Sequence, residues 1–258
     1  MHPPKSPQLL QRRPLDWLVL PVALLASAWM AASTWERVKT KPRDLSIQVT
    51  GSATKRITSD LIQWSAMIDV SDPDRTAAYR QLRDHATQVV EYLKAAGVSE
   101  DDIRVSSADV REQFETEVTG TGEERVEHTV RSGFELTQVI SVSSYDIAHV
   151  EKASREVTGL LEKGISISSS APQYHYTKLG DLKIEMLAAA SADARARAEN
   201  IVEAAGGQIG ALLGADMGVI NINPPNSRSS SWDGNNDTST LDKDIITIVH
   251  ATFELERD

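Results

Sequence analysis

The sequence of 258 residues contains no cysteine. A chain without thiols cannot build a disulfide framework, a thiolate zinc site, an iron–sulfur cluster or a cysteine nucleophile. Aromatic residues make up only 5%, and positive charge is the minority sign, with 27 Lys and Arg against 37 Asp and Glu. The resulting net charge of −10 argues against nucleic acid as a general partner.

The charge is unevenly distributed along the chain. Residues 1–44 contain seven bases and three acids, whereas the remaining residues contain 20 bases and 34 acids. A segment of net charge +4 therefore precedes a body of net charge −14. This arrangement is typical of a protein that is targeted to a membrane.

An uncharged, apolar run occupies residues 17–34. A helix of this length would span about 27 Å, close to the hydrocarbon thickness of about 30 Å. Trp17 and Trp35 stand at its two ends, where indole rings favour the membrane interface. We therefore expect residues 17–35 to form a single-pass transmembrane anchor.

The anchor divides the chain into a cytoplasmic N-terminus (residues 1–16), a stalk (residues 36–44) and an extracytoplasmic body (residues 45–258). One alternative is a cleaved signal peptide that releases a soluble body, because Ala26-Ser27-Ala28 has the small residues of a cleavage site. Another is a buried helix of a soluble protein. The full apolar length and the paired tryptophans favour the anchor.

The body alternates segments of strand period with segments of helix period. Strands are expected over residues 45–51, 60–70, 103–118, 125–143, 165–176, 219–223 and 244–255, with a hairpin turn over residues 119–122. Helices are expected from a cap at Asp72-Pro73 to Gly97, over residues 145–161, and over residues 180–205. A polar segment, residues 224–242, is expected to be a mobile loop. This order predicts an α+β fold of antiparallel strand pairs and about three packed helices.

A series of different short motifs follows one another, in a particular order, through residues 45–255. They contain Gly51, Asp60, Trp64, Gly97, Gly133, Phe134, Pro172, Tyr174, Thr177, Leu179, Lys183, Ala194, Arg195, Ala198, Gly206 and Gly210. In this order and spacing the chain resembles the SIMPL-domain family of bacterial envelope proteins, most closely the branch that has an N-terminal membrane helix. One departure is Ser59, which stands where better-known periplasmic members tend to have a proline before the aspartate.

The resemblance implies an α+β body on the periplasmic side of the bacterial inner membrane. It also implies homo-oligomeric rings or cages in some members, and a loose association with envelope and oxidative stress. It supplies no catalytic residues and no mechanism.

A search for chemistry-bearing patterns yields no catalytic motif, no expected cofactor and no metal-ligand spacing among the six histidines. His175 lies between Tyr174 and Tyr176, and strand alternation would place both tyrosines on one face. Asp233, Asn235, Asp237, Ser239 and Asp244 echo the spacing of a calcium loop, but the required glycine and glutamate are missing. We expect these residues to belong to a solvated loop.

The leading hypothesis is a non-enzymatic, membrane-anchored envelope protein that self-assembles outside the cytoplasm. The alanine-rich face of the third helix would pack internally or against another subunit, and Trp64 would pack in the core. A rival hypothesis is a periplasmic module that binds a ligand or peptide in a pocket lined by Tyr174, Tyr176 or Trp64. An enzyme of unrecognised type is the third hypothesis.

Overall fold

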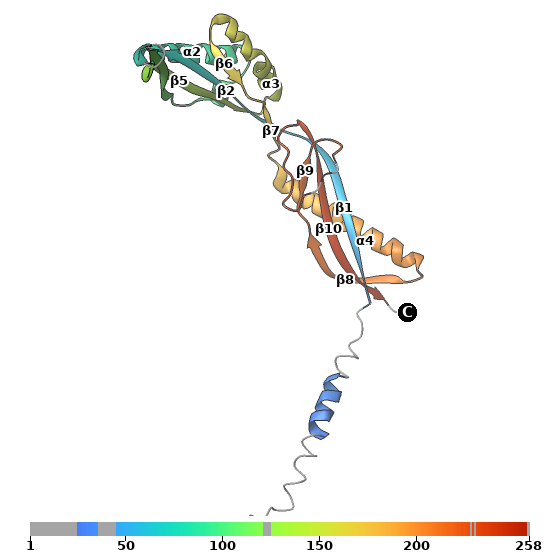
Figure 1. The fold of residues 1–258 in the computed structure, drawn as a ribbon. Coiled ribbons are helices and arrows are strands. Elements are labelled where there is room, and N and C mark those ends of the chain that lie inside the picture. The colour runs from blue at the N-terminus through green and yellow to red at the C-terminus, as the bar shows by residue number, and fades with distance from the viewer. Residues whose placement is uncertain (1–24, 36–44, 121–124, 228, 230, 257–258) are drawn as a thin grey trace, which may run out of the picture. The chain divides into compact units, whose positions relative to one another are not determined.

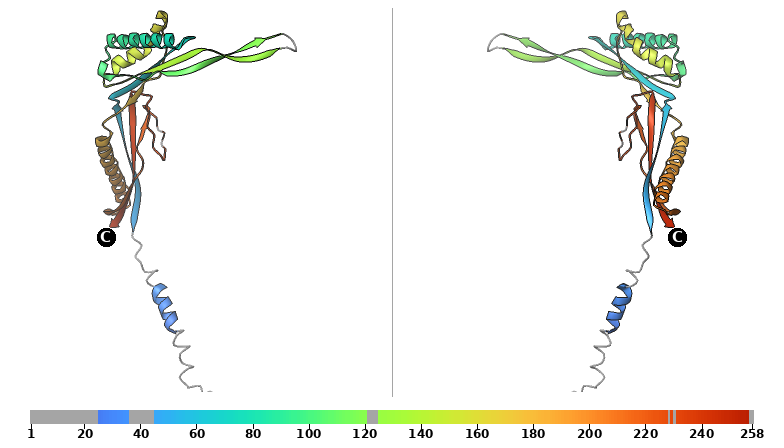
Figure 2. Two further views of the ribbon diagram at one scale, coloured as in Figure 1. Left: turned by 90° about the vertical axis from the view of Figure 1, so that its left-hand side faces the viewer. Right: turned by 90° about the vertical axis from the view of Figure 1, so that its right-hand side faces the viewer.

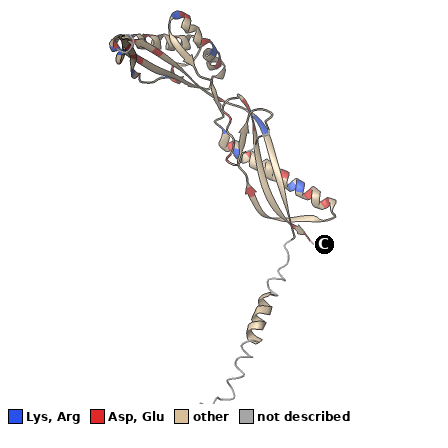
Figure 3. Cartoon of the chain, in the orientation of Figure 1, with Lys and Arg blue, Asp and Glu red and all other residues tan. Residues whose placement is uncertain are grey.

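The computed structural model describes residues 25–35, 45–120, 125–227, 229 and 231–256 (Figure 1). The chain divides into two compact units, residues 1–46 and residues 47–258, and each is described by itself. In the first unit, residues 25–35 form a helix without charged residues (Figure 3). No helix among the described residues is long and apolar enough to cross a membrane. Residues 17–24 of the expected anchor, which include Trp17, lie outside the described residues, as do the whole expected stalk and the expected cytoplasmic N-terminus.

In the described residues of the second unit there are two antiparallel sheets and three α-helices, so the predicted α+β class is confirmed. One sheet has the order β3-β5-β2-β6, with β4 also on β5 and β7 on β2; the other has the order β1-β10-β8, with β9 on β10. The first sheet consists of β2 (Leu61–Asp72), β3 (Ile103–Val105), β4 (Asp109–Thr119), β5 (Val126–Ser144), β6 (Ser166–Ser169) and β7 (Gln173–His175). The second consists of β1 (Ser46–Thr58), β8 (Gln208–Met217), β9 (Asn221–Asn223) and β10 (Asp242–Glu256).

The chain order makes the first sheet an insertion into the second. After β1 the chain builds the whole six-stranded sheet with its helices, α2 (Arg75–Ala95) and α3 (Ile147–Glu156), and only then returns through α4 (Leu179–Ala204). We call the six-stranded part with its helices the inserted module, and the part made of β1, α4, β8, β9 and β10 the parent module.

The inserted module is held together by a sheet face covered by helices. Alternate residues of β2 from Ile62 to Val70 are buried, as the period of two requires. They pack in one cluster with the helix residues Ala78, Leu82, Ala86, Val89 and Leu93 of α2. A 3₁₀ turn (Val157–Lys163) continues α3 and ends at Gly164, whose φ of 79° is the left-handed value that favours glycine.

The parent module is held together by the alanine face of α4. Ala190, Ala194 and Ala198 are fully buried, and the last two pack with Val49 of β1 and Phe253 of β10. The small side chains let the helix approach the sheet closely. The expected internal packing of the alanine face is therefore confirmed for Ala190, Ala194 and Ala198.

The boundaries of the first helix differ from the prediction. The N-cap is Asp74, whose carboxylate accepts a hydrogen bond from the amide of Ala77 at 2.7 Å. Asp72 instead accepts from the amide of Asp74, and Pro73 precedes the helix. The expected cap at Asp72-Pro73 is therefore wrong by two residues, because two aspartates compete for the same role.

Strand β8 is missing from the predicted elements. Its sequence contains Gly210 and Gly214 and lacks polar alternation, because nearly all of its residues are exposed at the sheet edge. Two shifts in its register with β10 leave extra residues on β8. Bulges of this kind protect an edge strand against pairing with other chains.

Candidate functional site

Strands β4 and β5 continue beyond the inserted module as a two-stranded ribbon. We define the arm as residues 109–120 and 125–132; none of them is fully buried. β5 begins to pair with β2 only at Phe134, opposite Asp72. Figure 2 shows the ribbon running clear of the helices. A two-stranded hairpin without a third layer is marginally stable in water, so the arm is the kind of element that a partner stabilises.

One face of the arm carries an apolar stripe. Val110, Phe114 and Val118 share this face by strand alternation, and 36%, 57% and 47% of their surfaces are exposed. Opposite Phe114 lies Arg131, whose guanidinium stands 5.0 Å from the ring centre of Phe134. Exposed apolar stripes with polar rims are typical of protein interaction surfaces.

A groove runs along α2 on the side of β3. It has a volume of about 640 Å³ and an apolar lining that includes Leu82, Ala86, Val90 and Val105. Three charged side chains also line it: Arg83, Glu91 and Lys94. The helix side of the groove extends over about four turns, from Tyr79 to Lys94.

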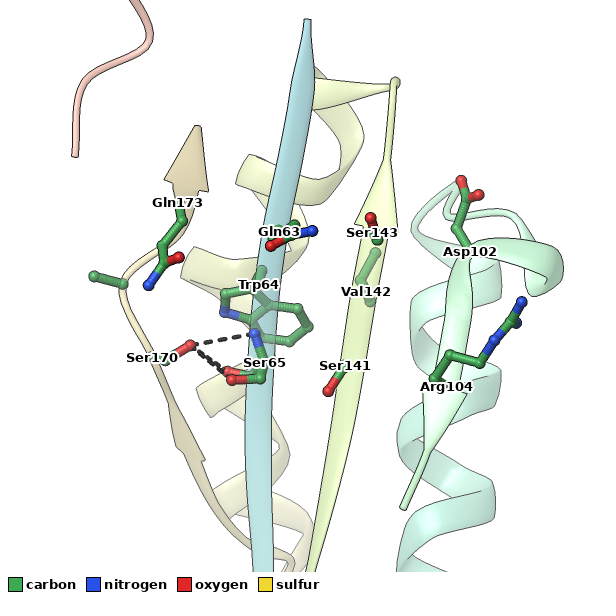
Figure 4. A pocket seen from close by; sticks show the side chains of 11 residues that line it. Gln63, Trp64, Ser65, Asp102, Arg104, Ser141, Val142, Ser143, Ser170 and Gln173 are labelled. Atoms are coloured by element: carbon green, nitrogen blue, oxygen red, sulfur yellow. Dashed lines mark hydrogen bonds between the residues drawn. The ribbon is translucent and has the colours of Figure 1, made fainter. Parts of the chain in front are cut away.

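A polar cavity of about 430 Å³ lies against β2, β3 and β5 (Figure 4). Ser65 and Ser170 bridge two of its walls with an Oγ–Oγ contact of 3.1 Å. Its other lining residues are Gln63, Trp64, Asp102, Arg104, Ser141, Val142, Ser143, Ala171 and Gln173. Within the part of the chain that the structure describes, Arg104 has no carboxylate partner and donates only to the backbone carbonyls of Asp101 and Ile103.

Another cavity, of about 410 Å³, lies beside Trp232 and the end of β8. Trp232 is 96% exposed, and Met217 and Val219 line the same cavity. This is a third apolar surface on the body, and it belongs to the parent module.

A buried ion pair stands in the segment that the sequence predicted to be a solvated loop. Lys243 is 1% exposed, and its Nζ lies 3.3 Å from the Asp237 carboxylate and donates to the Asp237 carbonyl. The same carboxylate accepts hydrogen bonds from Ser239 at 2.6 Å and from Thr240. The prediction of a solvated loop is wrong here, because hydrogen bonds and a buried cation hold Asp237.

The electrostatics of this pair are asymmetric. Burial raises the pKa of the Asp237 carboxyl, but hydrogen bonds from Ser239 and Thr240 and the charge of Lys243 lower it more, to well below the usual range. Burial lowers the pKa of Lys243 even with Asp237 beside it. Nearby, hydrogen bonds from Arg56 and from the amide of Asn226 lower the pKa of Asp244 to about 2.

These contacts show which partners bind the aspartates of the calcium-like series. Asp237 is engaged by Lys243, and Asp244 by Arg56 at 2.8 Å. Among the described residues, no group of three His, Asp or Glu side chains is placed to hold a metal ion. The spacing therefore serves to position cations of the chain itself.

Comparison with known proteins adds one finding. A family model described as SIMPL, a protein of unknown function (DUF541), matches residues 47–244, from the start of β1 to the start of β10. The chain belongs to the SIMPL family. No curated protein matches it significantly. The match includes the whole inserted module and most of the parent module, and leaves out residues 1–46 and 245–258.

Several of the residues on which the predicted resemblance rested are packing positions. Gly51 faces α4 beside Ala194, and Trp64 is buried and donates to Ser169 Oγ at 3.0 Å, so its expected core position is confirmed. The backbone needs glycine at Gly97 (φ 93°) and Gly206 (φ 80°), at the ends of α2 and α4. Gly133 lies where β5 passes the Asp72 carbonyl.

Other residues on which the predicted resemblance rested lie nearer the surface. Arg195 pairs with Glu199 at 2.8 Å, Lys183 is exposed, and Gly210 lies in β8 beside Glu254. Pro172 is half-buried in the break between β6 and β7, and Leu179 packs at the start of α4. These residues are not gathered at one site.

Asp60 and Thr177 meet at the neck between the two modules. They are 117 positions apart, yet the Asp60 carboxylate accepts hydrogen bonds from the Thr177 amide at 2.7 Å and its hydroxyl at 2.8 Å. Asp60 lies where the chain passes from β1 to β2, and Thr177 lies where it passes from β7 to α4. The pair therefore links the two segments that connect the modules. The resemblance named both residues, but spacing alone could not show that they touch.

The substitution Asp60→Ala is expected to lower the free energy of unfolding by about 1–3 kcal/mol, because it leaves two donors at the neck without their acceptor. Thr177→Val removes only the hydroxyl and should cost less. Urea denaturation of both variants measures the difference. Equal stability of Asp60→Ala and the unaltered chain would contradict a role for the neck.

Tyr174 and Tyr176 were predicted to share one face of a strand, and this prediction is wrong. β7 ends at His175, and the chain then turns toward α4. Tyr174 packs on the inserted module, and Tyr176 on the parent module. Burial and a 2.5 Å hydrogen bond to Glu151 raise the pKa of Tyr174 to about 12. The two tyrosines therefore pack in different modules, whereas Trp64, the third residue of the binding hypothesis, lines the polar cavity.

Proposed function

We propose that this SIMPL protein is a non-enzymatic envelope protein that self-assembles into a homo-oligomer outside the cytoplasm. The observation that carries the proposal is the arm, a ribbon exposed on both faces with an apolar stripe on one. A non-enzymatic role is supported by how the carboxylates with the strongest pKa shifts are used, since Asp237 and Asp244 are bound to Lys243 and Arg56. The resemblance also suggests a link to envelope or oxidative stress, which predicts peroxide sensitivity of a strain lacking the protein.

We further propose that residues 17–35 anchor the body in the inner membrane. The apolar run and its tryptophans support this, and within the helix over residues 25–35 the side chains of Leu25, Trp29 and Met30 are exposed. Anchoring in one plane raises the effective concentration of the bodies and favours assembly through weak contacts. The mass of the mature chain tests the signal-peptide alternative: an anchored chain keeps its 28.2 kDa, and a cleaved one loses its N-terminal segment.

Self-assembly predicts that the full chain in detergent elutes as a species several times the mass of one chain. Size-exclusion chromatography with light scattering measures this mass over a range of concentrations. The body, residues 45–258, should assemble at a higher concentration, because it lacks the anchor. If the full chain and the body both remain monomeric at high concentration, the proposal is wrong.

The second candidate function is a binding module, which the polar cavity in Figure 4 favours. Arg104 and the hydroxyls of Ser141 and Ser143 suit a polar ligand that carries a carboxylate. Titration with an acidic saccharide and with a dipeptide, followed by nuclear magnetic resonance, tests it. Shifts that disappear in Arg104→Ala would support binding, and an unchanged spectrum would reject it for these probes.

A further inference from the structure

We propose that the arm of one copy docks into the α2 groove of a second copy of this chain. The inference rests on the proposed self-assembly and names the two surfaces that would meet. It starts from two features of the inserted module that lack a partner among the described residues: an apolar stripe that projects, and an apolar groove that is open. Three properties of these surfaces match: length, polarity and charge order.

The lengths agree. The stripe from Val110 to Val118 covers eight residue steps of strand, or about 27 Å. The helix side of the groove from Tyr79 to Lys94 covers fifteen residue steps, or about 22 Å. A ribbon laid along α2 therefore places most of its stripe, including Phe114 and Val118, on the groove.

The apolar surfaces complement each other. Phe114 is the largest exposed apolar side chain of the arm, and Tyr79 and Val105 are half-exposed at the groove. Docking would bury all three, together with Val118. A central aromatic side chain in an apolar groove is the usual form of an interface hot spot.

The charges on the two surfaces alternate in opposite senses. Cross-strand neighbours share a face, so Glu112, Arg131 and Glu127 accompany the stripe in the order acid, base, acid. The groove presents Lys94, Glu91 and Arg83 in the order base, acid, base.

The spacings of these charges also match. Glu112 and Glu127 stand about 20 Å apart along the ribbon, and Lys94 and Arg83 about 17 Å apart along α2. In each set, the central charge lies nearer the first end than the second. When the tip of the arm points toward Tyr79, three opposite charges face one another: Glu112 with Lys94, Arg131 with Glu91, and Glu127 with Arg83.

Within the described residues, the ion pairs that these charges form in a single chain are exposed. Lys94 pairs with Glu100 at 2.6 Å, Arg83 with Asp84 at 3.6 Å, and Glu112 with Arg131 at 3.4 Å. Exposed pairs of this kind contribute little to stability, so they can exchange for contacts across an interface. The opposite face of the arm carries Glu115 and Glu117, which have no ion pair in the described parts of the chain and serve as a control.

Charge reversal in the full chain tests the proposal. The groove variant Arg83→Glu/Lys94→Glu and the arm variant Glu112→Lys/Glu127→Lys should each assemble at a concentration at least about tenfold higher than the unaltered chain. Mixing the two variants should restore assembly, because each altered arm then meets an altered groove. The control variant Glu115→Lys/Glu117→Lys should assemble as the unaltered chain does.

The absence of cysteine from the chain allows a second readout. Thr87 of the groove and Thr116 of the stripe lie at matching positions in the proposed register. A mixture of the single variants Thr87→Cys and Thr116→Cys should form a disulfide-linked dimer on oxidation. Replacing Thr116→Cys by Glu117→Cys, on the other face of the arm, should lower the yield severalfold.

The outcomes separate this inference from the proposed function. If the unaltered chain assembles and the reversed variants assemble equally well, the arm and groove are not the interface. Loss of assembly in Trp232→Ala, with the charge variants unaffected, would place the contact at the parent module instead. If the unaltered chain is a monomer, self-assembly itself is wrong and this inference is wrong with it.

Discussion

Replacing Gly51 by alanine is expected to lower the free energy of unfolding by about 3 kcal/mol or more. A Cβ at this position would lie 2.2 Å from the Ala190 carbonyl oxygen and 2.4 Å from the Ala194 amide nitrogen. Both are backbone atoms of α4, so no rotamer change can relieve the overlap. Either β1 or the whole helix must shift, and the buried alanine face then loses its packing against the sheet. Urea denaturation followed by circular dichroism measures the loss.

Two further variants show whether the close approach is the cause. Gly214→Ala lies in the same sheet, where an added Cβ meets nothing within 4 Å, and should change stability by no more than about 0.5 kcal/mol. Ala194→Gly removes a side chain but leaves the α4 backbone in place, so it should not rescue Gly51→Ala. Rescue would show that the overlap with the Ala194 Cβ, at 2.6 Å, matters more than the two backbone overlaps.

Removing Asp237 should also be severe. Asp237→Ala leaves the Lys243 ammonium buried without its counter-charge, and such a loss costs about 3–5 kcal/mol. Adding Lys243→Met in the same chain removes the stranded charge and should recover a large part of the stability. Urea denaturation of the two single variants and the double variant forms a double-mutant cycle. A double variant as unstable as the sum of the singles would contradict a coupled pair.

The pair also predicts a dependence of stability on pH. The pKa of Asp237 is lower in the folded protein than in the unfolded chain, where it is about 3.9. Its stabilisation is therefore complete above that value and is lost as the pH falls from there toward the lower, folded pKa. Urea denaturation between pH 7 and pH 2 should show that the free energy of unfolding falls less in Asp237→Asn than in the unaltered chain. If the free energy of unfolding falls equally in both proteins, other carboxylates cause the loss of stability in acid.

The elements that the sequence predicted well are those whose burial follows a period. The apolar positions of α2 and β2 are buried on one side, so periodicity identified both. β8 lacks such a pattern because it is exposed at an edge. The two strands of the arm were predicted, but not their departure from the sheet, because that depends on where β2 stops pairing with β5.

The candidate site was harder to predict, for a physical reason. Lys243 looks like a surface residue in the sequence, and its burial depends on a hydrogen-bonded loop that brings Asp237 to it. The groove depends on how α2 lies beside β3, which no local pattern encodes. The motif residues Asp60 and Thr177 are joined only because the chain leaves and re-enters the parent module at one neck.

The insertion has a consequence for the order in which the protein folds. β1 is made early, but its strand partner β10 is almost the last segment of the chain, and Thr50 and His250 form their 3.0 Å contact across 200 positions. All strands of the inserted module have been synthesised once the chain reaches His175. This module can therefore fold before β10, the strand that pairs with β1, has been synthesised. Contacts over such separations form slowly, because the chain must first close a long loop. During synthesis the parent module is therefore the late step, and Lys55 and Arg56 protect the unpaired β1 from joining foreign strands.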